Sequence, residues 1–152
     1  MTSEYEEIYS RFLLRVTDYK FAGLEEKIAN EMMNSWLRST LSKPYIRRLF
    51  SSVTIDDDVE SIDYELSVSV DNDSDKDFIE EVLAMGMVVE WLLPQYYSVL
   101  NTSQFFSNSE QKWYSQANHM TELREMLKNA QNDLRKMIRD RGYINNSYIS
   151  ES

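Results

Sequence analysis

Apolar residues recur at helical spacing along residues 118–141, and this is the most regular pattern in the chain. Steps of three and four place these residues on one stripe of an α-helix, while charged residues fill the other faces. The pattern predicts a long C-terminal helix whose apolar face has to be covered by the rest of the chain or by another copy. The residues of the stripe are Met120, Leu123, Leu127, Ala130, Leu134, Met137 and Ile138.

Two helices are predicted in the first third of the chain. The first covers about residues 3–16, where Ser3 and Glu6 have the spacing of a capping box, in which the two side chains satisfy backbone N–H groups at a helix start. The second covers about residues 18–41. It ends before Pro44, because the residue that precedes a proline avoids the helical conformation.

A third helix, over residues 78–92, is apolar around most of its circumference, so we expect it to be the central and most buried one. Asp75 is the expected N-cap. Gly86 weakens the helix by about 1 kcal/mol relative to Ala, which indicates a close crossing with another helix at that point. Pro94 is expected to end or kink the helix, with a shorter helix over residues 95–106.

The spacing of apolar residues changes from helical to alternating within residues 53–70. Apolar and polar residues alternate over residues 64–70, as in a strand with one buried face. Val53 and Ile55 are the expected partner strand, across the acidic linker 56–60. Two strands alone are marginally stable, so we expect this hairpin to pack on helices or to join strands of another subunit.

The elements together predict a mostly α protein, a helical bundle around the long C-terminal helix with a small β-hairpin near residues 53–70. With 152 residues, 42% of them apolar, the chain is expected to form one domain over residues 1–142 and a tail over 143–152. No run reaches the ~18 apolar residues of a membrane span, and the acidic N-terminus is unlike a signal peptide. Zero cysteines exclude disulfides and agree with a cytoplasmic site of synthesis.

Charge is distributed unevenly along the chain. The net charge of −10 argues against general binding to the phosphate backbone of nucleic acids. Residues 56–81 hold twelve acidic side chains and one base, whereas residues 122–141 hold four acids and six bases. Such polarity suits ordered contact between copies or between different partners. The alternative is that the acidic segment is simply a solvated face.

The sequence carries no recognisable catalytic motif. Residues 71–75 place three aspartates like the first ligands of an EF-hand, but Lys76 replaces the required glycine and Val82 the bidentate glutamate. His119 is the only histidine and is interpreted as structural. Phosphate-binding loops and nucleophile elbows are absent. We therefore expect no enzyme activity, no metal and no cofactor.

The tail combines apolar side chains with Asn and Ser and is too short to hold a core of its own. One interpretation is a frayed terminus. The other is a strand-forming arm that pairs with an exposed sheet edge on a neighbouring molecule. In the second case the residues that make the contact are Tyr143, Ile144, Tyr148 and Ile149.

Three segments resemble the small neck proteins, of the head-to-tail connector or adaptor type, of tailed bacteriophages that infect Gram-positive bacteria. They are IYSRFLLRVTDYKFAGL (8–24), MVVEWLLPQYYSVL (87–100) and WYSQANHMTELREMLKNAQNDLRKMIRDRGY (113–143), and the Ser-Gln-Ala-Asn-His run that enters the long helix is the most specific part. The resemblance covers about the first quarter and the last two fifths of the chain, and it does not extend to residues 43–75.

The resemblance implies a mostly helical virion protein, made in the host cytoplasm and located in the neck between head and tail. It implies a homo-oligomeric ring, commonly twelve-fold, that contacts the portal protein and a tail-side stopper or tail terminator. DNA would pass through the lumen without specific binding, because acidic residues repel phosphates. The candidate lumen-facing acids are Asp56, Asp57, Asp58, Asp71 and Asp73, and the candidate interface bases are Arg124, Lys128, Arg135 and Arg139.

Two further hypotheses compete with the connector. A monomeric helical regulator or chaperone would bind one protein partner through the tail or the apolar stripe. A metal-dependent hydrolase would use the acids of residues 56–77, and it ranks last because the sequence provides no complete ligand set.

Overall fold

The computed structural model describes residues 1–16, 23–103 and 110–142, with side chains from 1 to 98, outside the first gap, and from 119 to 141. The described part is mostly helical with one small antiparallel sheet, as predicted. Its elements are β1 (Thr2–Glu4), α1 (Tyr5–Arg15), α3 (Glu26–Ser42), α4 (Pro44–Arg47), β2 (Phe50–Asp56), β3 (Ser61–Leu66), α5 (Asn72–Ser103) and α6 (Glu110–Gly142).

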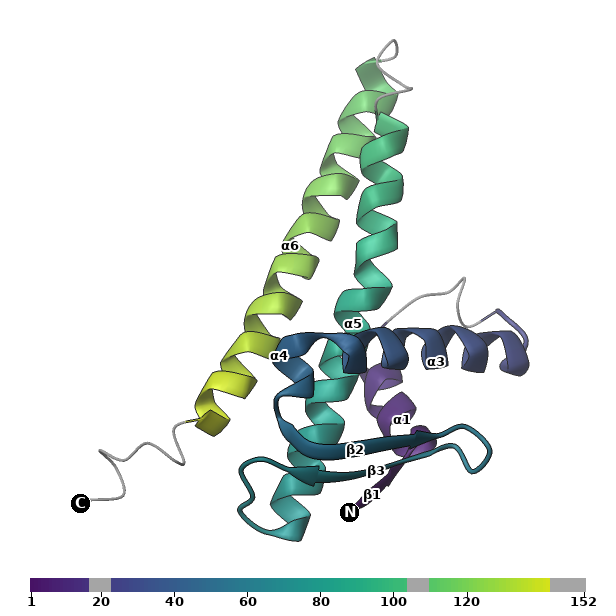
Figure 1. The fold of residues 1–152 in the computed structure, drawn as a ribbon. Coiled ribbons are helices and arrows are strands. Elements are labelled where there is room, and N and C mark those ends of the chain that lie inside the picture. The colour runs from purple at the N-terminus through teal and green to yellow at the C-terminus, as the bar shows by residue number, and fades with distance from the viewer. Residues whose placement is uncertain (17–22, 104–109, 143–152) are drawn as a thin grey trace, which may run out of the picture.

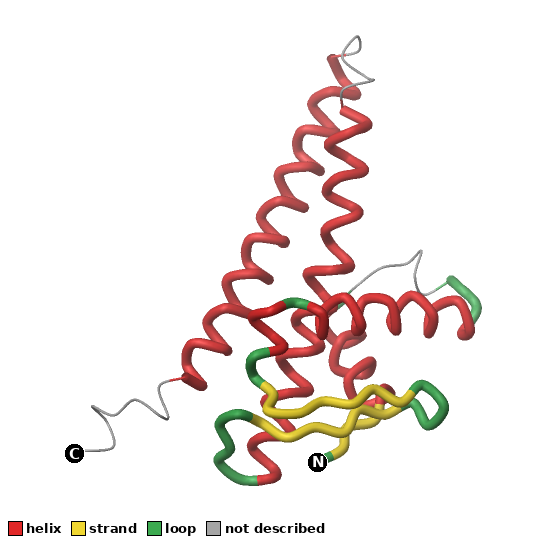
Figure 2. Tube along the Cα trace, viewed as in Figure 1, coloured by secondary structure: helices red, strands yellow, loops and turns green. Residues whose placement is uncertain are grey.

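The described elements form a compact body from which a helical hairpin extends (Figure 1). In the body, α1 and the first half of α5 lie over one face of the sheet, and α3 crosses α5 above the sheet in this view (Figures 1 and 2). The second half of α5 and the first half of α6 project from the body as an antiparallel pair. With 32 and 33 residues, these helices are each about 50 Å long.

Helix α5 is the element that contacts most of the others, since it packs against α1, α3, α6 and β1. The prediction of a central, buried helix over residues 78–92 is confirmed, because Ile79, Leu83 and Met87 are fully buried. The described contacts therefore gather around α5, and they do not confirm a bundle built around the C-terminal helix. Helix α6 packs mainly along α5 through Leu123, Leu127, Ala130 and Leu134. Each buried leucine contributes roughly 1.5–3 kcal/mol.

The predicted close crossing at Gly86 is confirmed. A Cβ atom at Gly86 would lie 2.2 Å from the Cγ2 atom of Thr40 on α3, so only a glycine permits this approach. Helix α3 ends at Ser42, before Pro44, as predicted. The predicted helix over about residues 18–41 is too long at its start, because residues 23–25 are not helical and α3 begins at Glu26. Asp18 itself lies outside the described residues.

The sheet has three strands in the order β1-β3-β2, all antiparallel. The predicted hairpin forms, but β3 spans Ser61–Leu66 and does not reach residue 70. Just after β3, the Ser67 N–H and hydroxyl donate hydrogen bonds to the carbonyls of Leu49 and Arg48, the two residues that precede β2. The third strand comes from the N-terminus of the same chain, where Ser3 pairs with Ile62.

Three local predictions are corrected by the structure. The first helix does not begin at Ser3, which lies in β1; the capping box is made by Glu4 and Glu7. Asp75 is not an N-cap, because α5 begins one turn earlier and Asp71 Oδ1 accepts the Ser74 N–H. At Pro94, where an end or a kink was expected, helix α5 does not end but continues to Ser103 with the proline exposed on its surface, so the separate helix predicted over residues 95–106 is part of α5 as far as the described residues reach.

Candidate functional site

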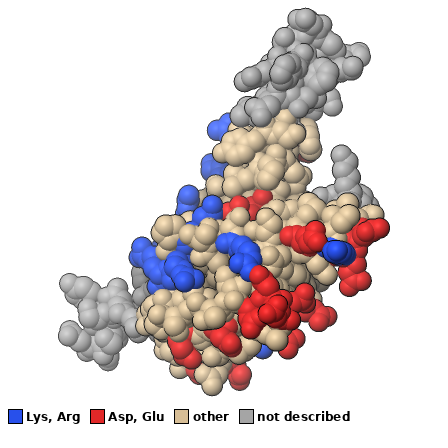
Figure 3. All heavy atoms as spheres, turned by 45° about the vertical axis from the view of Figure 1, so that its right-hand side comes forward, with Lys and Arg blue, Asp and Glu red and all other residues tan. Residues whose placement is uncertain are grey.

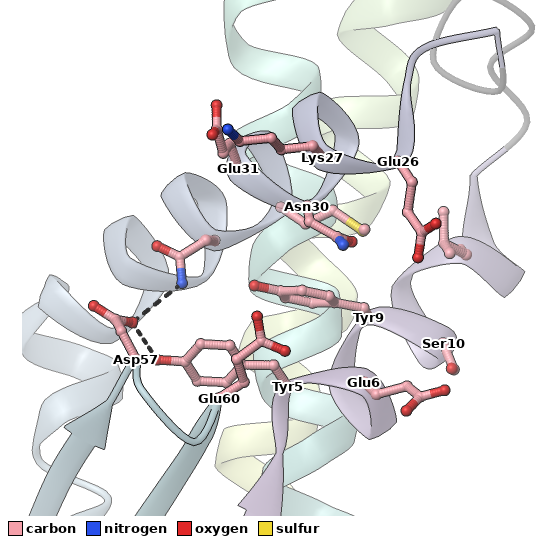
Figure 4. Close-up of a pocket in the computed structure, with 13 residues that line it drawn as sticks. Tyr5, Glu6, Tyr9, Ser10, Glu26, Lys27, Asn30, Glu31, Asp57 and Glu60 are labelled. Carbon is pink, nitrogen blue, oxygen red and sulfur yellow. Dashed lines mark hydrogen bonds between the residues drawn. The ribbon is translucent and has the colours of Figure 1, made fainter.

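An open cleft of about 900 Å³ lies between α1, α3 and the turn that joins β2 to β3 (Figure 4). Its walls carry carboxylates, amides and aromatic rings together with two apolar side chains. We call it the acidic cleft, defined by its lining residues Tyr5, Glu6, Tyr9, Ser10, Leu13, Glu26, Lys27, Asn30, Glu31, Met33, Asn34, Asp57 and Glu60.

Two tyrosines of α1 form the floor of the acidic cleft. Tyr5 and Tyr9 are four residues apart, so they lie one above the other on the same face of the helix, with ring centroids 5.8 Å apart. Both are buried, at 3% and 9% exposure. The capping box of Glu4 and Glu7 fixes the start of α1 and therefore the position of Tyr5 as its first residue.

Asp57, in the β2–β3 turn, contacts both other walls of the cleft, α1 and α3. It accepts a hydrogen bond of 2.6 Å from the Tyr5 hydroxyl on α1 and one of 3.4 Å from Asn34 Nδ2 on α3, and it forms an ion pair with Arg38. The Tyr5 hydroxyl, assisted by Arg38, holds the pKa of Asp57 below its ordinary value. Burial, followed by the bond to Asp57, raises the pKa of Tyr5.

The turn itself is shaped by its acidic residues. Asp56 Oδ1 accepts the backbone N–H groups of Asp58 and Val59, at 3.0 and 3.3 Å. Glu60 has a φ of 51°, in the left-handed region, and its carbonyl accepts the Tyr5 N–H at 2.8 Å. The acids of residues 56–60 thus close the hairpin and dock it on α1, which is a structural role that the sequence did not reveal.

The electrostatic character of the cleft is strongly negative. Five carboxylates and one lysine line it. Figure 4 shows Glu26 on α3 and Glu60 in the turn extending toward the cleft from different sides. Burial raises the pKa of Tyr9 to about 12, with Asn34 opposing and Glu60 adding to the shift, so its hydroxyl stays protonated at neutral pH. A concave surface with this excess of carboxylates favours a cationic side chain such as that of Arg or Lys.

A second polar cluster lies inside the body around Glu80 of α5, which is 3% exposed. Its Oε1 accepts a 2.8 Å bond from the Ser3 hydroxyl, which lies 3.0 Å from the Tyr64 hydroxyl. Arg11 Nε is 3.2 Å from Glu80 Oε2, and Lys76 Nζ is 3.8 Å from Oε1. Burial raises the pKa of Glu80 above its ordinary value. The cluster joins β1, β3, α1 and α5.

A buried ion pair fastens the end of α6 to the start of α5. Arg141 pairs with Asp75, which is fully buried and also accepts bonds from the Ser69 hydroxyl at 2.6 Å and the Val70 N–H at 2.9 Å. The guanidinium carbon of Arg141 lies 4.7 Å from the centre of the Phe78 ring. Burial alone would raise the pKa of Asp75, but these donors and Arg141 together lower it.

The structure separates the residues that the sequence analysis grouped as lumen-facing acids. Three of them lie in the β2–β3 turn, whereas Asp71 and Asp73 lie at the start of α5, at the other end of β3. A six-residue strand is about 20 Å long, so the two groups do not form one surface cluster. The four predicted interface bases are exposed along α6, at Arg124, Lys128, Arg135 and Arg139. The predicted contacts of the tail, from Tyr143 to Ile149, lie outside the described residues.

Sequence reasoning missed the acidic cleft, although part of its signal was present. The spacing of Tyr5 and Tyr9 places both rings on one face of the first helix, beside the apolar residues Ile8 and Phe12. Leu13 has the helical spacing of an apolar residue on this helix, yet it is 44% exposed at the edge of the cleft. No local pattern indicates that residues 26–34 and 57–60 meet α1.

Among the residues that the structure describes, no group of three or more His, Cys, Asp or Glu is arranged to hold a metal ion. His119 is exposed on α6. In the same part of the chain, no helix combines the length and apolar character needed to cross a membrane. Comparisons of the chain with family models, curated proteins and solved structures found no match.

Proposed function

We propose that the chain is a structural subunit, a head-to-tail connector that forms a homo-oligomeric ring between the portal and a tail-side neck protein of a phage virion. The observation that supports this most is the separation of charge on the two parts of the molecule. The acidic cleft lies on the body, whereas exposed bases line α6 (Figure 3). Figure 3 shows most blue side chains along the left side of the molecule and most red ones across its lower part and on the right.

Separated charges of opposite sign favour contact between different surfaces of neighbouring copies. Such heterologous contacts generate closed rings when the rotation between copies closes. The extended pair of α5 and α6 gives each subunit a long lateral surface for this purpose (Figure 1). In the proposed ring, commonly of twelve copies in the resembling proteins, a helical bundle around the long C-terminal helix would form between subunits.

The acidic surface also suits passage of DNA through a ring. Carboxylates repel phosphates, so DNA would move through the lumen without specific binding. The acids of the β2–β3 turn and those at the start of α5 are separate candidates for facing the lumen, since they lie at opposite ends of β3. The proposal places the protein in the virion neck, after synthesis in the host cytoplasm, without a cofactor.

The proposal is tested by mass photometry of the purified protein alone and mixed with its portal, and by mass spectrometry of purified virions. We expect a complex with portal rings and stoichiometric presence in virions. A strict monomer that never joins portal rings and is missing from virions would refute the connector. The same result together with one small partner would favour the alternative, a monomeric helical regulator or chaperone.

A further inference from the structure

We propose that the acidic cleft is the docking site for the basic face of α6 of a second copy of the chain. This inference rests on the proposed ring and specifies the contact between neighbouring subunits. The cleft supplies a concave negative surface, and α6 supplies a convex positive one. Both surfaces are parts of the same chain, so each copy would offer one to each of its two neighbours.

The basic face of α6 is a continuous stripe. At 100° per residue, Arg124, Lys128, Arg135 and Arg139 fall within about 60° of one another. The positions between them on this face, Gln131 and Asn132, are uncharged, so no acidic side chain interrupts the stripe. The stripe lies about a third of a turn from the leucines that α6 buries against α5, which leaves it exposed.

The bases of the stripe are not neutralised within the molecule. Within the described part of the chain, no ion pair joins Arg124, Lys128 or Arg135 to a carboxylate, and Arg139 has only its neighbour Asp140, at 3.9 Å. By contrast, Arg11 and Arg15 bind Glu81 within the body. The stripe therefore keeps its positive charge for a contact outside the subunit.

The basic stripe also contains two side chains that are close enough to enter the cleft together. Arg135 and Arg139 are four residues apart, which is a rise of about 6 Å along α6. Glu26 and Glu60 extend toward the cleft from different sides (Figure 4). Two successive basic side chains of the stripe can thus enter the cleft together and form ion pairs with carboxylates of its walls.

The contact is tested first by charge reversal. Sedimentation velocity of the full chain should show self-association at low salt that weakens at about 1 M salt, where the screening length falls to about 3 Å. Reversing the stripe with Arg135→Glu and Arg139→Glu should weaken association at least about tenfold, since like charges then face each other. Glu26→Lys with Glu60→Lys should do the same, and all four changes in one chain should restore association to within about threefold.

Lys136→Glu is the matched control, because Lys136 is exposed beside Arg135 but points about 100° away from the stripe. It changes the net charge as much as Arg135→Glu alone does, and it should leave association within about threefold of the wild-type value, whereas Arg135→Glu alone should weaken association more than that. A wild-type chain that remains monomeric at low salt would overturn the inference. So would equal effects of the stripe variant and this control.

Disulfide trapping gives an independent measurement, because the chain has no cysteine of its own. Mixing the Glu26→Cys chain with the Arg135→Cys chain under mild oxidation should give the mixed dimer in excess of either homodimer. Lys136→Cys in place of Arg135→Cys should not. If stripe and cleft variants still form rings and bind portal normally, the docking inference fails and the connector survives. If cleft variants lose only portal binding, the occupant is the portal and this inference is wrong.

Discussion

Replacing Gly86 by Ala tests the close crossing of α3 and α5. The added Cβ would lie 2.2 Å from Thr40 Cγ2, more than 1 Å closer than ordinary van der Waals contact. Thr40 is 1% exposed and its hydroxyl donates a 2.9 Å bond to the Trp36 carbonyl. To relieve the overlap, Thr40 has to rotate and break that bond, or the two helices have to move apart.

The expected effect is a net destabilisation. Overpacking of a core costs about 1–3 kcal/mol, and the fully buried site places this variant in the upper half of that range. Alanine is better than glycine in a helix by about 1 kcal/mol, which offsets part of the cost. The free energy of unfolding should therefore fall by about 1–2 kcal/mol. The melting temperature should fall by roughly 2–8 °C.

A double-mutant cycle with Thr40→Ser isolates the steric cause. Serine keeps the hydroxyl but lacks Cγ2, so the atoms nearest to the added Cβ are then at 3.1 and 3.2 Å, distances that shifts of a few tenths of an ångström relieve. In that background Gly86→Ala should cost little or stabilise, giving a coupling energy of at least about 1 kcal/mol. Urea unfolding followed by circular dichroism measures all four proteins. A stabilised Gly86→Ala, or coupling near zero, would refute the packing argument.

Three other predictions concern the polar clusters. Asp75→Asn should lower the free energy of unfolding by about 3 kcal/mol or more, because it leaves the Arg141 charge buried without a carboxylate. Urea titration measures this loss, and a value below about 1 kcal/mol would contradict the prediction. Burial raises the folded-state pKa of Glu80, so its ionisation destabilises the folded protein, and the stability of Glu80→Gln relative to wild type should rise as the pH increases above the ordinary glutamate pKa of about 4.5. A flat or falling difference in melting temperature would count against it. Tyr5→Phe removes the donor to Asp57, so it should lower the melting temperature and move the Asp57 pKa, measured by NMR, up toward its ordinary value. An unmoved pKa would exclude the hydrogen bond as the cause of the shift.

The parts of the fold that follow from local patterns were predictable from the sequence. The apolar circumference of residues 78–92 made α5 the central helix, and Gly86 indicated the crossing because glycine inside a helix needs a packing reason. Pro44 marked the end of α3 correctly. These signals depend on residues close together in the chain, which periodicity and capping rules describe directly.

The errors arose where a distant partner determines the local structure. Asp75 looks like an N-cap, but Arg141 and the backbone of Val70 hold it inside the protein. Ser3 has the spacing of a helix start, but its hydroxyl donates a hydrogen bond to Glu80, which is 77 residues later in the chain. Pro94 looks like a helix end, yet α5 continues, since packing of the long helix outweighs one missing hydrogen bond.

The acidic cleft was not predictable for the same reason. Its floor, its rim and its turn come from three separate segments, and their meeting depends on the contacts of Asp57 with Tyr5, Asn34 and Arg38. The bases of α6 were identified because all of them lie on one helix. A surface that lies on one helix can be predicted from the spacing of its residues along the sequence. A concave surface formed by several elements cannot be predicted in this way.

The position of β1 has a consequence for the order of folding. Ser3 pairs with Ile62, so this strand has to wait until 59 further residues have been synthesised. Its partner β3 can meanwhile pair with β2 across a short turn, because closing a small loop costs less entropy than closing a large one. The first strand to leave the ribosome is therefore the last to enter the sheet, and until it does the outer edge of β3 is open to a strand from another chain.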